Sequence, residues 1–269
     1  MTDHPGPSPA VLAAFGARDA RGEPIAGGEE TSVLAGGIVF KQVQDVIVSE
    51  WGQVLLANLR PAGVSTTEPI AASDGRWSVD GWIATRFISR LRSLKHDPAR
   101  VIDAGNRLAD AIADRPPACV DPVRQRADRW ARADRCVWGE EAVPLKPEAN
   151  SVAGVLRAKL RSPDRERATI VHGDLTGNVF ADPSDRPVVL DFTPVLRPRR
   201  FAAAIVVGDN LLWNDGDVGL RTLLDNDDDA LARALLFRLI AEQLADRPRH
   251  HRNLDDYRRV IGLLDWAAS

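Results

Sequence analysis

Apolar residues alternate or cluster in short runs along the first third of the chain, and they predict strands around one helix. The runs "SVLA" and "IVFKQV" stand on either side of Gly36-Gly37. A two-residue Gly-Gly link between β-prone runs is typical of a tight hairpin. Asp45 follows as a candidate N-cap for a helix that runs to about Leu59.

A second hairpin is expected from "EPIAAS" through Asp74-Gly75 to "RWSVDGWIATRF". The opening segment, "MTDHPGPSPA", is polar and rich in proline, so residues 1–22 are expected to form a loose arm. Residues 23–88 are then expected to form a small β-rich lobe, and residues 89–269 a second lobe.

From Asp97 onward the apolar spacing becomes that of helices. Asp97-Pro98 and Asp121-Pro122 each place a capping residue before a proline, which favours a helix start. The first of these helices is expected to end near Arg115 and the second near Arg135. Further helices are predicted at residues 148–161, 201–213, 228–244 and 254–267. The fold class predicted is α+β, with a small β-rich lobe followed by a larger, mainly helical lobe.

One strand-like region of the second lobe carries polar residues at its strand ends. "IVHGDLTGNVF" at 170–180 and "VVLDF" at 188–192 are joined by the turn-rich "ADPSDRP". Asp174 and Asn178 follow the first strand and Asp191 closes the next, so a hairpin would bring these three side chains close together. Carboxylate and carboxamide oxygens suit Mg²⁺, which usually takes substrate phosphates as further ligands. The remaining carboxylate could then act on a substrate hydroxyl.

Composition narrows the classes of function. With 44% hydrophobic residues among 269, the chain can bury one large core or two modest ones. The net charge of -3 argues against nucleic acid as a partner. We expect no membrane span, because no apolar run reaches 18 residues, and we expect no secretory signal. Cys119 and Cys136 are expected to be reduced thiols, which indicates a cytoplasmic protein.

The motif "HGDLTGNV" followed by "VVLDF" resembles the catalytic hairpin of aminoglycoside phosphotransferases, choline kinases and related small-molecule kinases. The resemblance covers most of the chain, because a β-rich lobe precedes a helical lobe in the same order. It implies a two-lobe, protein-kinase-like fold with ATP or GTP and Mg²⁺ as cofactors. Asp174 would be the catalytic base, and Asn178 and Asp191 would hold the metal ions that bridge the nucleotide phosphates. His172 would brace the loop.

The resemblance also implies nucleotide contacts in the first lobe. Lys41 would contact the α- and β-phosphates, and Glu50 on the following helix would be its ion-pair partner. The loop at 27–31, which contains Gly28, would lie over the phosphates. The stretch 81–85, which contains Trp82, would lie near the lobe hinge and the adenine.

Each of these residues also has a purely structural interpretation. Asp174 and Asp191 could be a turn cap and a salt-bridge partner, and Asn178 could cap a loop. Lys41 could protect an edge strand, and Glu50 could be a solvated helix charge.

Three charged segments raise further questions. "DNDDDA" at 225–230 has the composition of a metal loop, but we interpret it as a helix cap with an acidic first turn. "RPRR" at 197–200 is interpreted as a solvated surface, with a contact to an anionic acceptor as the alternative. The acidic stretch 209–217 could attract a cationic acceptor, or could simply be solvated.

The sequence predicts a phosphotransferase that moves the γ-phosphate of ATP or GTP to a hydroxyl of a small molecule or peptide. Two alternatives stay open. Three residues separate Asp174 from Asn178, where the family usually has four, which favours a nucleotide-binding pseudokinase that contacts a protein partner. His172, Asp174 and Asp191 could instead form the site of a metal-dependent hydrolase.

Overall fold

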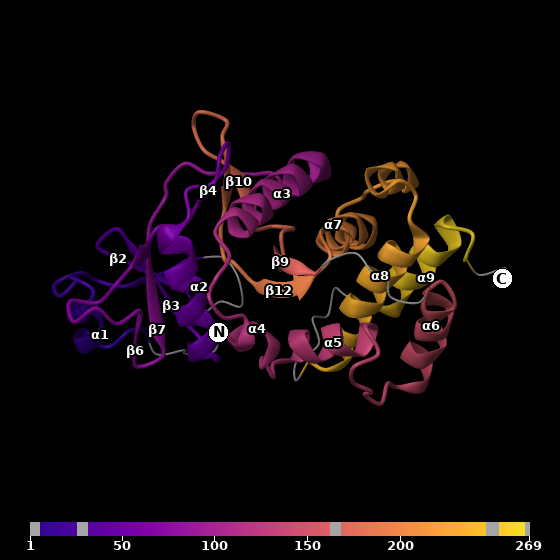
Figure 1. Cartoon of the computed structure of the whole chain (residues 1–269), viewed down its shortest axis with the longest axis horizontal. Coiled ribbons are helices and arrows are strands. Elements are labelled where there is room, and N and C mark those ends of the chain that lie inside the picture. Colours follow the sequence, from indigo (N-terminus) through magenta and orange to yellow (C-terminus); the bar gives the residue numbers. More distant parts are fainter. Residues whose placement is uncertain (1–5, 26–31, 162–167, 246–252, 267–269) are drawn as a thin grey trace.

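The computed structural model describes residues 6–25, 32–161, 168–245 and 253–266. Its sheet-rich N-terminal part and its helical C-terminal part follow each other along the longest axis of the molecule (Figure 1). The α+β architecture predicted from the sequence is confirmed.

A six-stranded sheet within residues 23–86 forms the N-terminal lobe. Its strands lie in the order β1 (Glu23–Pro24), β2 (Ser32–Ala35), β3 (Ile38–Gln42), β7 (Trp82–Arg86) and β5 (Pro69–Ile70), and β6 (Ser78–Val79) pairs with β7. The predicted hairpin at Gly36-Gly37 is confirmed, since Ala35 pairs with Ile38. Both glycines have positive φ, 58° and 77°, which a residue without Cβ adopts at little cost.

The pairing in the second predicted hairpin is confirmed, since β5 pairs antiparallel with β7, but the chain makes a further turn between these strands. β6 and β7 are joined at Asp80-Gly81, where both residues have positive φ, 49° and 76°. A two-residue turn of this kind matches the twist of the strands. Asp74-Gly75 forms only a local turn, closed by a hydrogen bond from the Ala72 N–H to the Arg76 carbonyl. Both Asp-Gly dipeptides therefore lie in turns, and β5 and β6 both pair with β7.

The segment predicted to be a loose arm contains a packed helix. α1 (Pro9–Ala14) begins after Ser8, whose hydroxyl accepts a hydrogen bond from the Val11 N–H. Val11 and Phe15 are buried against Phe40 and Trp82 of the sheet. The prediction is wrong for residues 9–17, because the run "AVLAAF" acquires a partner surface only when the sheet has formed.

α2 (Val46–Asn58) follows β3 and connects the two lobes. Its predicted N-cap is confirmed, because the Asp45 carboxylate accepts a hydrogen bond from the Val48 N–H at 3.1 Å. Val48, Leu55 and Leu56 are buried in a cluster with residues of α3 (Pro98–Asp114). The helix therefore packs its apolar face against the C-terminal lobe.

Helices dominate the C-terminal lobe. After α3 they are α4 (Asp121–Arg124), α5 (Arg129–Val137), α6 (Pro147–Ala158), α7 (Arg199–Trp213), the 3-10 helix η1 (Val218–Leu224), α8 (Asp228–Gln243) and α9 (Leu254–Leu263). α8 is the central helix, since every residue from Ala230 to Ala241 is buried.

One predicted helix is divided in two. The Asp121-Pro122 helix ends at Arg124, and a new helix starts at Arg129. The Asp121 side chain makes no capping hydrogen bond, whereas Asp128 accepts from two N–H groups of α5. A second cap within the predicted helix therefore breaks it.

Two small sheets lie at the junction of the lobes. One has the order β4 (Ser65–Thr66), β11 (Pro187–Val189), β10 (Val179–Ala181) and β8 (Arg92–Ser93), and the other pairs β9 (Thr169–His172) with β12 (Pro194–Arg197). The hairpin turn "ADPSDRP" between β10 and β11 is as predicted. The run "ATIV" was expected to pair with the strand that ends at Asp191, but β9 pairs with β12 instead. The loop after β9 thus separates two sheets.

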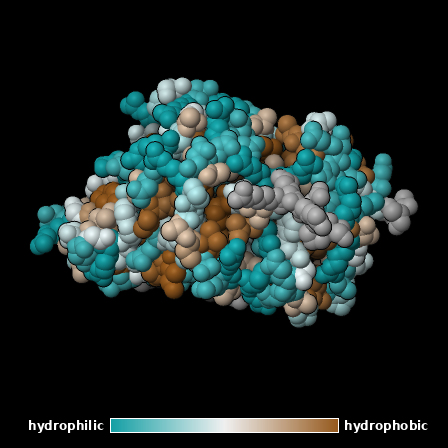
Figure 2. Space-filling view, in the orientation of Figure 1, coloured by the Kyte–Doolittle hydropathy of each residue, from teal (hydrophilic) through white to brown (hydrophobic). Residues whose placement is uncertain are grey.

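The surface in Figure 2 is mostly hydrophilic, with hydrophobic side chains gathered in the middle and left of that view. Ile47 and Val54 on α2 are 70% and 44% exposed. No helix in the described part of the chain is both long and apolar enough to cross a membrane. Cys119 and Cys136 are free thiols in the structure.

Candidate active site

The loop between β9 and β10 meets the end of β11 at the lobe junction. The Asn178 carbonyl accepts a hydrogen bond from the Leu190 N–H at 2.8 Å, so Asp191 follows directly beside it. The Asn178 amide donates to the Asp174 carbonyl at 2.7 Å and lies 3.4 Å from the Asp174 carboxylate. The structure therefore places the Asn178 and Asp174 side chains in contact, and Asp191 follows the residue whose backbone is bonded to Asn178.

His172 ties this loop to the segment that carries Asp191. Its Nδ1 accepts a hydrogen bond from the Asp174 N–H at 3.1 Å, so Nε2 carries the proton and donates to the Leu190 carbonyl at 3.2 Å. Burial lowers the pKa of His172 below its usual value, and the ring is only 2% exposed. Both nitrogens are engaged by backbone groups, which is the bracing role implied by the sequence.

Gly173 and the backbone beyond Asp191 are closely packed. A Cβ at Gly173 would lie 2.9 Å from the Val195 side chain, so only glycine allows β12 to approach β9 here. Asp191 itself has a positive φ of 46°, which is uncommon for a residue with a Cβ. Strained backbone of this kind concentrates at functional sites.

Lys41 reaches this site from the other lobe and forms an ion pair with Asp191. β3 lies between β2 and β7, so Lys41 does not protect an edge strand. The expected pair between Lys41 and Glu50 is not formed. Glu50 instead accepts a hydrogen bond from the Ser78 hydroxyl at 2.6 Å.

Trp82 does not face this site. Lys41 pairs with Ile83 and Gln42 pairs with Trp82, and neighbouring residues of a strand point to opposite faces. Trp82 is buried in the cluster beneath α1, so Ile83 is the residue of β7 on the Lys41 face. The proposed adenine contact therefore fails for the Trp82 side chain. Gly28 lies outside the described residues.

The structure adds two residues that the sequence analysis did not select for the site. Arg238 of α8 donates to the Asp174 carboxylate at 2.7 Å and to Asp209 of α7 at 2.6 and 2.7 Å. Burial alone would lower the pKa of Arg238, but the two carboxylates raise it above its usual value. Asp209 is 3% exposed, so it does not belong to a solvated acidic stretch. The arginine inside the apolar run "ALLFRLIA" could have indicated a buried ion pair from the sequence alone, because arginine is rarely buried without a partner.

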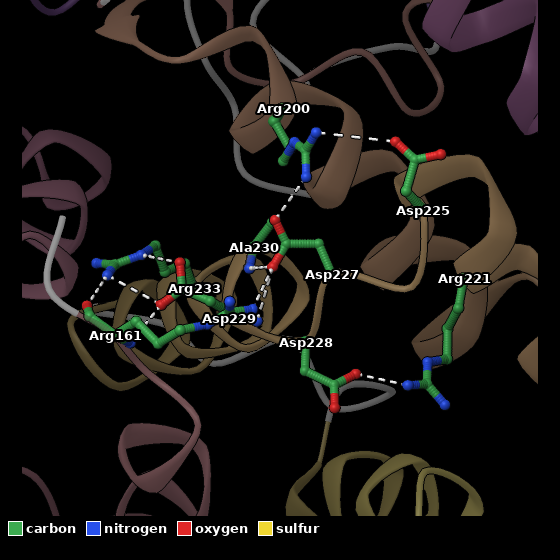
Figure 3. A network of polar contacts seen from close by, with 9 residues as sticks. All are labelled: Arg161, Arg200, Arg221, Asp225, Asp227, Asp228, Asp229, Ala230 and Arg233. Atoms are coloured by element: carbon green, nitrogen blue, oxygen red, sulfur yellow. Dashed lines mark hydrogen bonds and ion pairs between the residues drawn. The ribbon is translucent and has the colours of Figure 1, made fainter. Parts of the chain in front are cut away.

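The acidic segment at 225–230 is a helix cap, as interpreted from the sequence. Asp227 accepts hydrogen bonds from the N–H groups of Asp229 and Ala230 at 3.1 and 3.3 Å. Three aspartates of this segment pair with different arginines (Figure 3): Asp227 with Arg200 and Arg161, Asp228 with Arg221, and Asp229 with Arg233. The segment is therefore neutralised within the lobe.

The basic segment at 197–200 is also internally paired. Arg197 forms ion pairs with Asp134 and Glu140, and Arg199 with Asp110. These pairs give the segment a structural role and leave little reason to expect an anionic acceptor there.

The oxygen atoms near Asp191 fit Mg²⁺. Asn178 commits its NH₂ group to Asp174, and its Oδ1 accepts no hydrogen bond from the described residues. The Asp191 carboxylate is 33% exposed and contacts Lys41 through one oxygen. One carboxylate and one amide oxygen suit Mg²⁺ when phosphates and water complete the shell. The described residues contain no cluster of three or more His, Cys, Asp or Glu side chains able to hold a metal.

No family model and no curated protein matches the sequence. Solved structures do match. A choline/ethanolamine kinase family protein from Mesorhizobium loti is 18% identical over 96% of this chain and 93% of that chain, with a TM-score of 0.55. A choline kinase from Streptococcus pneumoniae is 11% identical over 91% and 93%, with a TM-score of 0.53.

An aminoglycoside phosphotransferase in ternary complex with AMP-PNP and hygromycin B is also similar. It is 14% identical over 97% of this chain and 98% of that chain, with a TM-score of 0.56. At such identities the likeness defines the fold. The chain has the fold of the aminoglycoside phosphotransferases and choline kinases, as the motif resemblance implies.

Proposed function

We propose that this protein is a phosphotransferase that uses ATP or GTP with Mg²⁺ to phosphorylate a hydroxyl group of a small molecule or peptide. The observation that carries the proposal is the meeting of Asp174, Asn178 and Asp191 with Lys41 of the opposite lobe. A metal-binding pair, a phosphate-binding cation and a carboxylate for the acceptor are the groups that phosphoryl transfer requires.

Each residue then has a distinct task. Asn178 and Asp191 would hold Mg²⁺, which neutralises charge on the nucleotide phosphates. Lys41 would bind the phosphates from the other lobe. Asp174 would align the acceptor hydroxyl for in-line attack and accept its proton, so catalysis would rest on positioning and electrostatics.

The solved neighbours support a nucleotide and a small-molecule acceptor. One contains AMP-PNP with hygromycin B, and a structure of LicA contains AMP. These ligands belong to those proteins. They make nucleotides and hydroxyl-bearing small molecules the first compounds to test on this chain.

A nucleotide-binding pseudokinase is the second candidate. The short spacing between Asp174 and Asn178 and the missing Lys41–Glu50 pair both favour it. The hydrolase alternative is weaker, because backbone groups occupy both nitrogens of His172.

Thermal unfolding with MgATP, MgGTP and Mg²⁺ alone tests the proposal. We expect an upward shift that needs both nucleotide and Mg²⁺, because a ligand that binds only the folded state stabilises it by mass action. Absence of a shift with either nucleotide would contradict the proposal, and a shift with metal alone would favour the hydrolase.

Asp174→Asn separates binding from chemistry. Loss of a general base typically lowers turnover by about 10²–10⁴-fold, while the nucleotide-dependent stabilisation should remain. Asp103→Asn, an exposed aspartate on α3, is the matched control and should retain turnover. Equal turnover in the two variants would remove Asp174 from its assigned role.

A further inference from the structure

α8 carries two buried arginines, of which one points to the candidate active site. Arg233 and Arg238 are each 4% exposed, and their guanidinium groups lie over Trp138 at 4.5 Å and Trp130 at 5.3 Å. Arg233 pairs with Asp229 on the same helix and donates to the Arg161 carbonyl at 2.6 Å, away from the site (Figure 3). The two arginines are therefore equally buried, but of the two only Arg238 donates to Asp174 of the candidate active site.

Arg238 is held on one side by Asp209. Its Nε and Nη2 donate to the two oxygens of that carboxylate at 2.7 and 2.6 Å, which fixes the plane of the guanidinium. Nη2 has a second hydrogen, which goes to Oδ1 of Asp174 at 2.7 Å. Asp209 thus determines where Arg238 can donate.

The Asp174 side chain is 41% exposed, so an acceptor can reach it from solvent. A carboxylate at that level of exposure would sample several rotamers if only solvent surrounded it, and each would aim its oxygens differently. The contact from a rigid, buried donor restricts this freedom before any acceptor binds.

We propose that Arg238, oriented by Asp209, is a positioning residue for phosphoryl transfer. It binds Oδ1 of Asp174, while the Asn178 amide lies 3.4 Å from Oδ2, and it so holds the carboxylate in the orientation that meets the acceptor hydroxyl. The inference rests on the proposed function, in which Asp174 aligns that hydroxyl. Misplacement of a catalytic group by about 1 Å can cost about 10²-fold in rate, which sets the size of the expected effect.

Steady-state kinetics of Arg238→Met and Arg238→Lys test the role, with Arg233→Met as the control from the same helix. We expect Arg238→Met to lower kcat by about 10²-fold with the KM for nucleotide unchanged. Arg238→Lys should recover part of that loss, because an ammonium keeps the charge but lacks the planar fork. Arg233→Met should keep kcat within about twofold, since that distant arginine does not touch the site. Equal kcat in Arg233→Met and Arg238→Met would overturn the proposal.

Removal of Arg238 leaves the buried Asp209 carboxylate without its positive partner, which destabilises the fold. The double variant Asp209→Asn/Arg238→Met removes both charges and is therefore expected to be more stable than Arg238→Met. A crystal structure of this variant shows the orientation of the Asp174 side chain without any measurement of turnover. We expect the Asp174 carboxylate to leave its wild-type rotamer or to be spread over several. An unchanged Asp174 would overturn the positioning role even if no acceptor is known. Failure of the proposed function looks different, because the wild-type protein would then neither bind MgATP or MgGTP nor transfer phosphate.

Discussion

Phe15→Ala tests whether the N-terminal segment is a structural part of the small lobe. Phe15 is 4% exposed and stands edge-on to Phe40, with ring centroids 5.8 Å apart. Truncation of a buried phenylalanine costs about 3–5 kcal/mol, of which an aromatic pair accounts for about 0.5–1.5 kcal/mol. α1 has only 6 residues, so it can move to close part of the cavity. We therefore expect a loss near the lower limit, about 3 kcal/mol.

Urea unfolding followed by tryptophan fluorescence measures this loss, and Trp82 in the same cluster reports on it locally. Arg18→Ala is the matched control, because Arg18 is exposed on the same segment and should change stability by less than about 0.5 kcal/mol. The stabilisation by MgATP should survive in Phe15→Ala, since the cluster lies on the sheet face opposite Lys41.

A loose arm predicts a different result. In that case Phe15→Ala and Arg18→Ala would both leave the free energy of unfolding unchanged within about 0.5 kcal/mol. That outcome would refute the packing of α1 on the sheet. Loss of nucleotide-dependent stabilisation in Phe15→Ala alone would instead show that the two faces of the sheet are coupled.

Three further perturbations have clear signs. Burial lowers the pKa of His172 in the folded protein, so the free energy of unfolding of the wild type should fall as the pH drops below 6.5. In urea titrations the free energy of unfolding of His172→Gln should depend less on pH than that of the wild type. Equal pH dependence of the two proteins would contradict this. Asp227→Ala removes a helix cap and should cost about 1–2 kcal/mol in urea unfolding. Asp225→Asn should cost almost nothing, because that side chain is 88% exposed and asparagine tolerates the positive φ of 53° there; equal losses would exclude the capping role. Lys41→Met should abolish most of the MgATP-dependent rise in melting temperature, and a full rise in that variant would remove Lys41 from the phosphate site.

Local signals made much of the fold predictable. A cap such as Asp45 or Asp97 bonds to an N–H three residues away, and a Gly-Gly turn connects adjacent strands, so the relevant atoms are close in sequence. The motif around Asp174 likewise selects Asn178 and Asp191, because one loop and one hairpin hold all three. Such features form from local contacts and do not depend on how distant segments pack.

Other features depend on contacts between distant segments. The face on which Trp82 lies follows from the register of β3 with β7, and the partner of β9 follows from β12, which begins after Asp191. The partner of Lys41 is 150 residues away, and Glu50 is engaged by Ser78 instead. A local pattern does not specify which of several acidic groups a lysine will meet.

The sequence by itself determined most of the helices, the local turns and the polar residues of the loop after β9, because short-range hydrogen bonds and backbone preferences act within a few residues. Only the tertiary structure decided that Arg238, paired with Asp209, contacts Asp174, since α8 meets the loop after β9 across 64 residues of sequence. Burial of a charged group is favourable only where a partner of opposite charge is held in place, and it is the packing of α7 against α8 that provides that partner.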